Sequence, residues 1–219
     1  MRFSKEVLYD KLYQTPIMPL FNHPDVEKSK AVVKACYDGG IRVFEYTNRG
    51  VGADKVFAAL VKYIRNDFPD MAIGIGTIYN AEEAEYFVSL DADFIVQPTL
   101  DVGVAQVCQK NDMAWFPGVL TPNEIYKAYL LGADIVKIFP ANILNPSFVK
   151  AVKTVMPQIE MMITGGVEPN ERSLNTWLDA GAKFVGMGGQ LFPKSILESN
   201  NFTWIENTVK ESLRILSNR

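Results

Sequence analysis

Two hydrophobic periodicities alternate along the whole chain. Short runs of consecutive apolar residues, many of them β-branched, are typical of strands that are buried on both faces. Between these runs, apolar residues recur every three or four positions, as in amphipathic helices. Strands are predicted at 15–21, 41–47, 71–78, 94–98, 113–119, 135–140, 159–166 and 184–189. Helices are predicted at 4–13, 26–40, 53–68, 80–92, 101–110, 121–133, 146–156, 170–182 and 202–216.

Each predicted strand is followed by a helix, which gives eight successive β-then-α units. Such regular alternation predicts parallel strands joined by crossover helices. Eight units favour a closed TIM (β/α)8 barrel with an extra N-terminal helix and a C-terminal helix. The alternative is an open flavodoxin-like or Rossmann sheet, but no GxGxxG motif opens the first helix of the pattern. With no linker or low-complexity stretch, residues 1–219 are expected to form a single barrel domain.

Capping residues mark several predicted helix starts and ends. Asn80 suits an N-cap, and Thr121 with Glu124 forms a capping box around Pro122, which suits a first turn. The helix at 26–40 ends on two glycines, which suit a left-handed cap. These local signals agree with the hydrophobic pattern.

Composition narrows the possible partners. The chain is 48% hydrophobic and 21% charged, with a net charge of −3, so charge gives no reason to expect binding to nucleic acid or an anionic membrane. The N-terminal residues are amphipathic and include acidic side chains, with no apolar stretch of signal-peptide type. No run of about 18 uncharged apolar residues is present that could span a bilayer. Cys36 and Cys108 lie on separate predicted helices without a CxxC motif. We therefore expect free, buried thiols in a cytoplasmic protein.

The sequence contains a single histidine, His23. A three-histidine or HExxH zinc site is impossible with one histidine, and we predict neither a metal nor a cofactor, although an all-carboxylate Mg²⁺ site is only weakly excluded. A Ser-His-Asp or Cys-His hydrolase is also disfavoured. The chemistry must therefore come from Lys, Glu, Arg, Thr and backbone amides.

Polar and special residues crowd the carboxyl ends of the predicted strands, where TIM barrels place their active sites. They are Glu45, Thr47, Arg49, Gly76, Thr77, Pro98, Lys137, Thr164, Gly165, Gly166, Gly188 and Gly189. A lysine in the middle of a buried strand is unusual because its ammonium loses hydration. Lys137 therefore either extends to solvent, pairs with a carboxylate, or is neutral and reactive.

Glu45 offers a partner for Lys137, since period-two alternation places Val43, Glu45 and Thr47 on one face of their strand. A purely structural buried ion pair is one explanation, and such pairs often only break even against hydrophobic packing. The other explanation is catalytic. A desolvated lysine has a lowered pKa, and its neutral amine can form a Schiff base with a carbonyl compound while a carboxylate moves protons. Arg49 offers a fork of donors for a substrate carboxylate, and Thr77 and Thr164 offer hydroxyls.

Two glycine pairs lie at the ends of the last two predicted strands, at 165–166 and 188–189. In many barrels this region binds phosphate through backbone N–H groups and a helix N-terminus. Tight βα turns would explain each pair equally well, but two pairs on adjacent strands favour phosphate binding.

With these residues in place, the chain resembles the class I 2-keto-3-deoxy-6-phosphogluconate (KDPG) aldolase family, which includes 4-hydroxy-2-oxoglutarate (KHG) aldolases. The resemblance runs from Thr15 to Phe192 and rests on FEYTNRG (44–50), GIGT (74–77), PGVLTPNE (117–124), VKIFPA (136–141), ITGG (163–166) and GMGG (186–189). It implies a metal-independent, cytoplasmic homotrimer of the Entner–Doudoroff pathway. The substrate would be cleaved to pyruvate and glyceraldehyde 3-phosphate.

The resemblance also implies roles for individual residues. Lys137 would form the Schiff base, and Glu45 would be the general acid and base. The pyruvate half would be surrounded by Arg49, Thr77, Thr164 and the Pro98 carbonyl. The phosphate would lie among Gly165, Gly166, Gly188, Gly189 and Gln190.

Two departures from the family pattern concern the substrate. Gly189-Gln190 stands where the family often has Gly-Gly-Ser, and Gln97-Pro98-Thr99 where Ser-Pro-Gly is common. A KHG aldolase, which would release pyruvate and glyoxylate, is the nearest alternative. Such an enzyme would make little use of the glycine pairs at 165–166 and 188–189. A non-catalytic barrel that binds a phosphorylated ligand is the alternative from another class. A phosphate-binding synthase or isomerase would explain an inward lysine less well.

Overall fold

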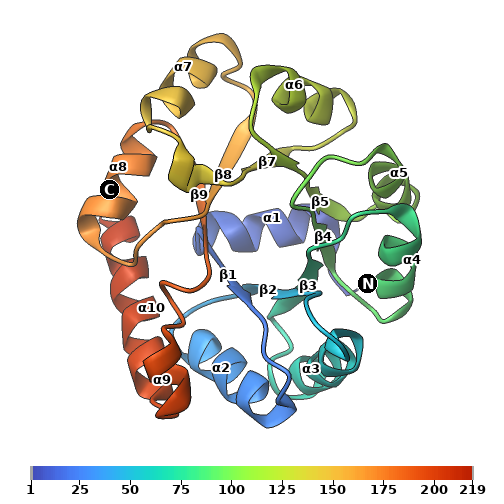
Figure 1. Ribbon diagram of the computed structural model, residues 1–219, viewed down its shortest axis with the longest axis vertical. Coiled ribbons are helices and arrows are strands. Elements are labelled where there is room, and N and C mark those ends of the chain that lie inside the picture. Colours follow the sequence, from blue (N-terminus) through green and yellow to red (C-terminus); the bar gives the residue numbers. More distant parts are fainter. Residues whose placement is uncertain (1, 219) are drawn as a thin grey trace.

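The computed structural model describes residues 2–218 as a nearly closed barrel of parallel strands surrounded by helices (Figure 1). Nine strand segments occur in this part of the chain. They are β1 (Ile17–Phe21), β2 (Val43–Thr47), β3 (Ala72–Gly76), β4 (Phe94–Val96), β5 (Ala114–Phe116), β6 (Gly118–Val119), β7 (Ile135–Ile138), β8 (Glu160–Thr164) and β9 (Phe184–Met187). The predicted TIM-type barrel is confirmed, and the open sheet is wrong.

The fifth predicted strand is split at Pro117 into β5 and β6. Proline has no N–H to contribute to a strand ladder, so the regular pairing breaks there. Both halves still pair, since β5 lies beside β4 and β6 lies beside β7. The two ends of the strand order are therefore halves of one strand, which brings the barrel round on itself.

Ten α-helices occur among residues 2–218, and most begin and end within a few residues of their predicted positions. They are α1 (Lys5–Gln14), α2 (Val26–Asp38), α3 (Ala53–Asp67), α4 (Ala81–Ser89), α5 (Val102–Lys110), α6 (Pro122–Leu130), α7 (Ser147–Val155), α8 (Glu171–Asp179), α9 (Lys194–Glu198) and α10 (Phe202–Ser217). The Asn80 cap and the Thr121–Glu124 capping box are present, and Gly40 has the left-handed φ expected after α2. None of these helices is long and apolar enough to cross a membrane. The one-turn η1 (Ala141–Ile143) and the short α9 were not predicted, because such short elements carry no hydrophobic period.

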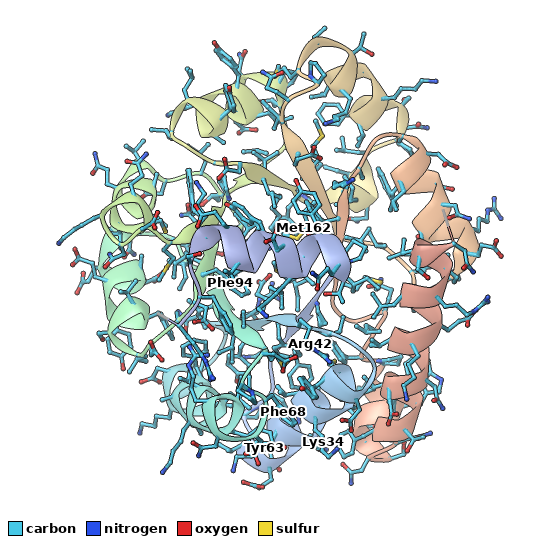
Figure 2. The ribbon with its side chains drawn as sticks, turned by 180° about the vertical axis from the view of Figure 1, so that it is seen from behind. Lys34, Arg42, Tyr63, Phe68, Phe94 and Met162 are labelled. Atoms are coloured by element: carbon cyan, nitrogen blue, oxygen red, sulfur yellow. The ribbon has the colours of Figure 1, made fainter. Side chains whose placement is uncertain are left out.

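Two apolar cores meet at the barrel wall. The larger core lies between the strands and the surrounding helices. The smaller core fills the barrel interior towards the amino-terminal ends of the strands. Leu8 and Leu12 of α1 are fully buried against the smaller core, so α1 covers the amino-terminal mouth (Figure 2). The C-terminal helix α10 packs instead between α2 and α8 in the outer ring. Only the carboxyl end of the barrel is thus left for a site.

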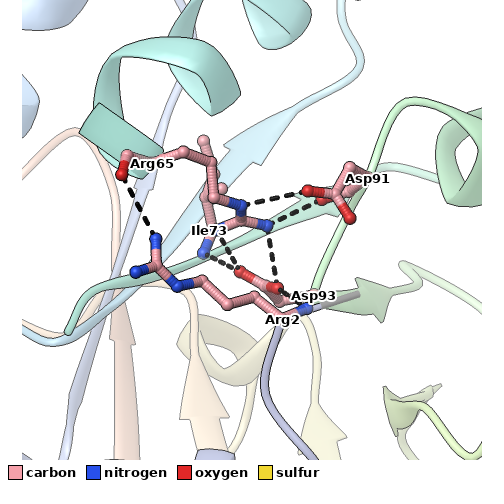
Figure 3. Close-up of polar contacts among 5 residues, drawn as sticks. All are labelled: Arg2, Arg65, Ile73, Asp91 and Asp93. Carbon is pink, nitrogen blue, oxygen red and sulfur yellow. Dashed lines mark hydrogen bonds and ion pairs between the residues drawn. The ribbon is translucent and has the colours of Figure 1, made fainter. Parts of the chain in front are cut away.

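A buried carboxylate ties the start of the chain to the barrel (Figure 3). The fully buried side chain of Asp93 accepts hydrogen bonds from the guanidinium of Arg65 at 2.8 and 2.9 Å and from the backbone N–H of Ile73 at 2.9 Å. The backbone N–H of Arg2 donates to the same carboxylate at 3.0 Å. Asp93 therefore connects the segment before α1 with α3, β3 and the start of β4.

We predict that Asp93→Asn lowers the free energy of unfolding by about 1–3 kcal/mol, because it removes the fully buried counter-ion of Arg65 and leaves that guanidinium only its half-exposed partner Asp91. Asp38→Asn is the matched control, since Asp38 forms an exposed i,i+4 pair with Lys34 and should contribute at most about 0.5 kcal/mol. Equilibrium unfolding in denaturant measures both losses. Equal losses in the two variants would contradict a stabilising role for the Asp93 network.

Candidate active site

The strand pattern places Glu45 and Lys137 inside the barrel. On β2, Phe44 and Tyr46 pack in the outer core while Val43 packs in the inner one, so Glu45 faces inward. The same alternation on β7, where Ile135 packs in the inner core, turns Lys137 inward. The Glu45 side chain is 0% exposed and that of Lys137 is 5% exposed, with 3.9 Å between Nζ and Oε1. Lys137 does not extend to solvent.

The pair lacks the hydrogen bonds that usually support a structural ion pair. Among residues 2–218, no donor lies within hydrogen-bond distance of either Glu45 carboxylate oxygen, and the buried Thr164 hydroxyl is also without a partner. The separation of 3.9 Å is too long for a hydrogen bond between Nζ and Oε1 themselves. A buried ion pair repays its desolvation only with close geometry and additional hydrogen bonds. This arrangement therefore does not resemble one built for stability.

Burial drives both groups towards their neutral forms. Desolvation raises the pKa of Glu45, although the charges of Lys137 and Arg49 act in the opposite direction. Desolvation lowers the pKa of Lys137, with the Glu45 charge opposing and the Arg49 charge adding to the shift. A neutral amine beside a group that can exchange a proton is the combination that carbonyl chemistry requires.

A pocket of about 460 Å³ opens above this pair at the carboxyl end of the barrel. Thr47 and Phe139 line this pocket. Thr47 lies two residues after Glu45, and Phe139 lies two residues after Lys137. The side chains of Glu45 and Lys137 therefore lie one layer deeper in the barrel than the lining of the pocket. Of the predicted site residues, the pocket brings together Arg49, Thr164, Gly165, Gly188, Gly189 and Gln190. The ring centroid of Phe139 is 5.2 Å from the Lys137 amine.

Arg49 and Thr77 join the ends of two neighbouring strands. The Nε–H of Arg49 donates to the Thr77 hydroxyl at 3.3 Å. Thr77 has a φ of 64°, a left-handed conformation that is unfavourable for a β-branched residue. Backbone strain of this kind persists where surrounding structure enforces it, often at functional sites.

Asn22 is a site residue that the sequence analysis missed. Its side-chain amide lines the pocket and donates to the carbonyl oxygens of Thr47 at 2.9 Å and Arg49 at 3.0 Å. Asn22 thereby holds the backbone segment that carries Arg49. A polar residue directly after the first strand was the available signal, because it lies at the same end of the barrel as the others.

Pro98 lies beside the main pocket rather than in it. It lines a neighbouring cavity of about 320 Å³, and Phe139 lines both cavities. The Pro98 carbonyl packs against Gly118, where a Cβ would lie only 2.3 Å from the carbonyl oxygen. Gly118 is in register with Lys137, so this carbonyl lies near the level of the lysine.

The glycine pairs at 165–166 and 188–189 differ in the structural reason for glycine at those positions. Gly165 and Gly166 have φ values of 107° and 74°, and a Cβ on Gly166 would lie 2.8 Å from that of Asn142. Turn geometry and packing against η1 account for this first pair, and Gly166 does not line the pocket.

Gly188 and Gly189 have ordinary φ values, and a Cβ on Gly189 would meet nothing within 4 Å. Within residues 2–218, no group accepts a hydrogen bond from the N–H of Gly189 or Gln190. This second pair leaves open space and free donors at the pocket.

Gln97 faces the outer core and not the pocket. Its side chain accepts a hydrogen bond from the Trp115 indole at 2.8 Å and donates to the carbonyl of Ile78 at 3.3 Å. Trp115 packs in the outer core, between strand and helix. The departure from the family pattern at position 97 therefore changes packing rather than the lining of the pocket.

Comparison with known proteins finds the same family across the chain. The family model described as Aldolase: KDPG and KHG aldolase matches residues 8–208. The 2-dehydro-3-deoxy-phosphogluconate aldolase of Haemophilus influenzae is 28% identical over 218 residues, which cover 99% of this chain and 100% of the relative. The 2-dehydro-3-deoxy-6-phosphogalactonate aldolase of Escherichia coli is 28% identical over 179 residues, 81% of this chain and 84% of the relative.

A solved structure agrees with these relatives. The KDPG aldolase of Legionella pneumophila, with pyruvate captured as a covalent carbinolamine intermediate, is 26% identical and superposes with a TM-score of 0.78. The match covers 91% of this chain and 95% of the Legionella chain.

Proposed function

The chain belongs to the KDPG and KHG aldolase family of lyases, and we propose that it is a Schiff-base-forming aldolase acting on KDPG or a close 2-keto-3-deoxy sugar acid. The products would be pyruvate and, from KDPG, glyceraldehyde 3-phosphate. The main support for this proposal is the inward pair of Lys137 and Glu45, which lie 3.9 Å apart. Neither Glu45 carboxylate oxygen has a hydrogen-bond partner within residues 2–218.

In the first step, the neutral amine of Lys137 attacks the C2 carbonyl of the substrate. The carbinolamine hydroxyl takes up a proton, from the neutral Glu45 carboxyl group or from solvent, and leaves as water. The product is a protonated imine, which is an electron sink. Burial supports this step because it favours the neutral, nucleophilic amine at a pH where an exposed lysine is charged.

In the second step, the Glu45 carboxylate accepts the proton of the C4 hydroxyl. The C3–C4 bond breaks, the aldehyde leaves, and the bonding electrons move into an enamine whose nitrogen is that of Lys137. Glu45 then returns the proton to C3, and water releases pyruvate and regenerates the amine. Free lone pairs on both carboxylate oxygens support this role.

The surroundings suit a keto acid with a long polar tail. Arg49 and the hydroxyls of Thr77 and Thr164 would bind the pyruvate carboxylate, near the Pro98 carbonyl. At the far end, the free N–H groups of Gly189 and Gln190, together with Gly165, Gly166 and Gly188, would bind a phosphate. The open space at this rim favours a phosphorylated sugar acid over 4-hydroxy-2-oxoglutarate, which is too short to use it.

The homotrimer and the cytoplasmic location expected from the sequence stay predictions. So does the choice between gluconate and galactonate epimers, since relatives of both names match the chain.

We predict that borohydride reduction in the presence of pyruvate attaches the substrate covalently to Lys137, detected by peptide mass. Lys137→Met should abolish the adduct while leaving the protein folded, because an apolar side chain of similar length is tolerated in the barrel. Lys150→Met, at an exposed position on α7, is the control and should retain the adduct. A folded protein that forms no adduct on Lys137 at saturating pyruvate would overturn the aldolase mechanism. Phosphate-ligand binding without turnover in the wild-type protein, together with survival of that binding in Lys137→Ala, would point to the non-catalytic barrel instead.

A second prediction concerns the phosphate end. Gly189→Asp should raise the KM for the phosphorylated substrate at least about 10-fold, since it places a negative charge beside the phosphate. Gly189→Asn is the control of matched shape, and its smaller effect isolates the charge from the added volume. Adduct formation with pyruvate should be the same in both variants. An equal KM in the Asp and Asn variants would place the phosphate elsewhere.

A further inference from the structure

Gly76 leaves a space that the catalytic carboxylate of the proposed mechanism fills. A Cβ built on Gly76 would lie 1.7 Å from Glu45 Oε1, 2.5 Å from Cδ and 2.9 Å from Cγ. Gly76 does not have a positive φ, so backbone conformation does not require glycine at this position. The volume of any larger side chain at position 76 is occupied by the Glu45 carboxylate.

The same relation recurs on the other side of the barrel. A Cβ on Gly186 of β9 would lie 2.3 Å from the Thr164 hydroxyl oxygen, and Gly186 also lacks a positive φ. Glu45 and Thr164 are the two residues whose buried side-chain oxygens are without a hydrogen-bond partner among residues 2–218. In both places a glycine on the adjacent strand gives space to an unpaired polar group of the candidate site.

We propose that Gly76 is a positioning residue, which fixes the Glu45 carboxylate where it can transfer protons at the carbon next to the Lys137 imine. This inference rests on the proposed function. Any larger residue at position 76 must displace the carboxylate, because the overlap is with its terminal atoms. The Lys137 amine is on β7 and keeps its place, so imine formation and proton transfer become separable.

The affected step can be written for pyruvate alone. In the protonated pyruvate imine, the Glu45 carboxylate removes a proton from the C3 methyl group. The C–H electron pair forms the C2–C3 double bond, and the imine π electrons move to the Lys137 nitrogen. In D₂O the carboxyl group exchanges its proton and returns a deuteron to C3. Exchange of the pyruvate methyl hydrogens, followed by NMR, therefore reports on Glu45 without any aldehyde.

The test compares exchange with the final amount of borohydride-trapped adduct in the same preparation. Gly76→Ala should lower the exchange rate at least about 100-fold, the usual contribution of a positioned acid–base group. The end-point amount of adduct on Lys137 at saturating pyruvate should stay near the wild-type value. A Gly76→Ala protein whose exchange rate matches wild type would overturn the proposal.

Gly74→Ala is the matched control. Gly74 is two residues earlier on the same inward face of β3, and a Cβ there would lie 2.3 Å from the Phe94 ring instead of from Glu45. Gly74→Ala should lower thermal stability through overpacking but leave the ratio of exchange to adduct unchanged. If both variants lower that ratio equally, general disturbance of the barrel explains the effect and the proposal fails.

A rescue experiment keeps the proposal testable even if Gly76→Ala folds poorly. Glu45→Asp shortens the side chain by one carbon and withdraws the oxygen that overlaps the new Cβ. Adding Gly76→Ala to Glu45→Asp should then reduce exchange less than 10-fold, against the 100-fold expected in the wild-type background. Equal reductions in both backgrounds would show that Gly76 does not act through Glu45. A wild-type protein with neither adduct nor exchange would instead contradict the proposed function itself.

Discussion

Lys137 and Glu45 are both withdrawn from water, and the barrel is organised around this buried pair. Two ionisable side chains face each other inside the barrel at 3.9 Å, with no other donor to the carboxylate in the part of the chain that is described. Burial opposes charge on both, which makes the pair costly for stability and useful for carbonyl chemistry. The fold supports this arrangement from below, where α1 and the inner core cover the amino-terminal mouth. Access is left at the carboxyl end, where the pocket opens.

Small residues shape the space around the pair in two different ways. Gly76 and Gly186 leave volume that protein side chains fill, namely the Glu45 carboxylate and the Thr164 hydroxyl. Gly188 and Gly189 lie at the rim of the pocket, where a Cβ on Gly189 would meet no atom of residues 2–218 within 4 Å and a Cβ on Gly188 would make only ordinary contact with Leu20, at 3.5 Å. The first pair controls where reactive groups lie, and the second leaves room for a ligand. Bulky side chains therefore fill the barrel interior towards the amino-terminal ends of the strands, where they stabilise the fold. Glycines are concentrated at the carboxyl ends, where the candidate site lies.

The sequence predicted the barrel and the inward pair because both follow from local periodicity. Alternation along β2 and β7 is enough to turn Glu45 and Lys137 to the same side of the wall. The split at Pro117 and the short η1 and α9 were missed, since they depend on single residues or lie below the length at which a period is visible. Asn22 was overlooked although its position after β1 was a usable signal. The steric roles of Gly76 and Gly166 could not be predicted, because they depend on atoms of other segments that meet only in the fold.

Whether burial favours the neutral amine of Lys137 can be tested by measuring the pKa of that side chain. Protein labelled with ¹³C at the lysine ε-carbons can be titrated by NMR, with Lys137→Met used to assign the signal. We predict one lysine that titrates below the ordinary value of about 10.4, and whose signal is absent from the variant. If the Lys137 signal titrates together with the exposed lysines or above them, burial does not favour the neutral amine, and the proposed Schiff-base mechanism lacks its nucleophile.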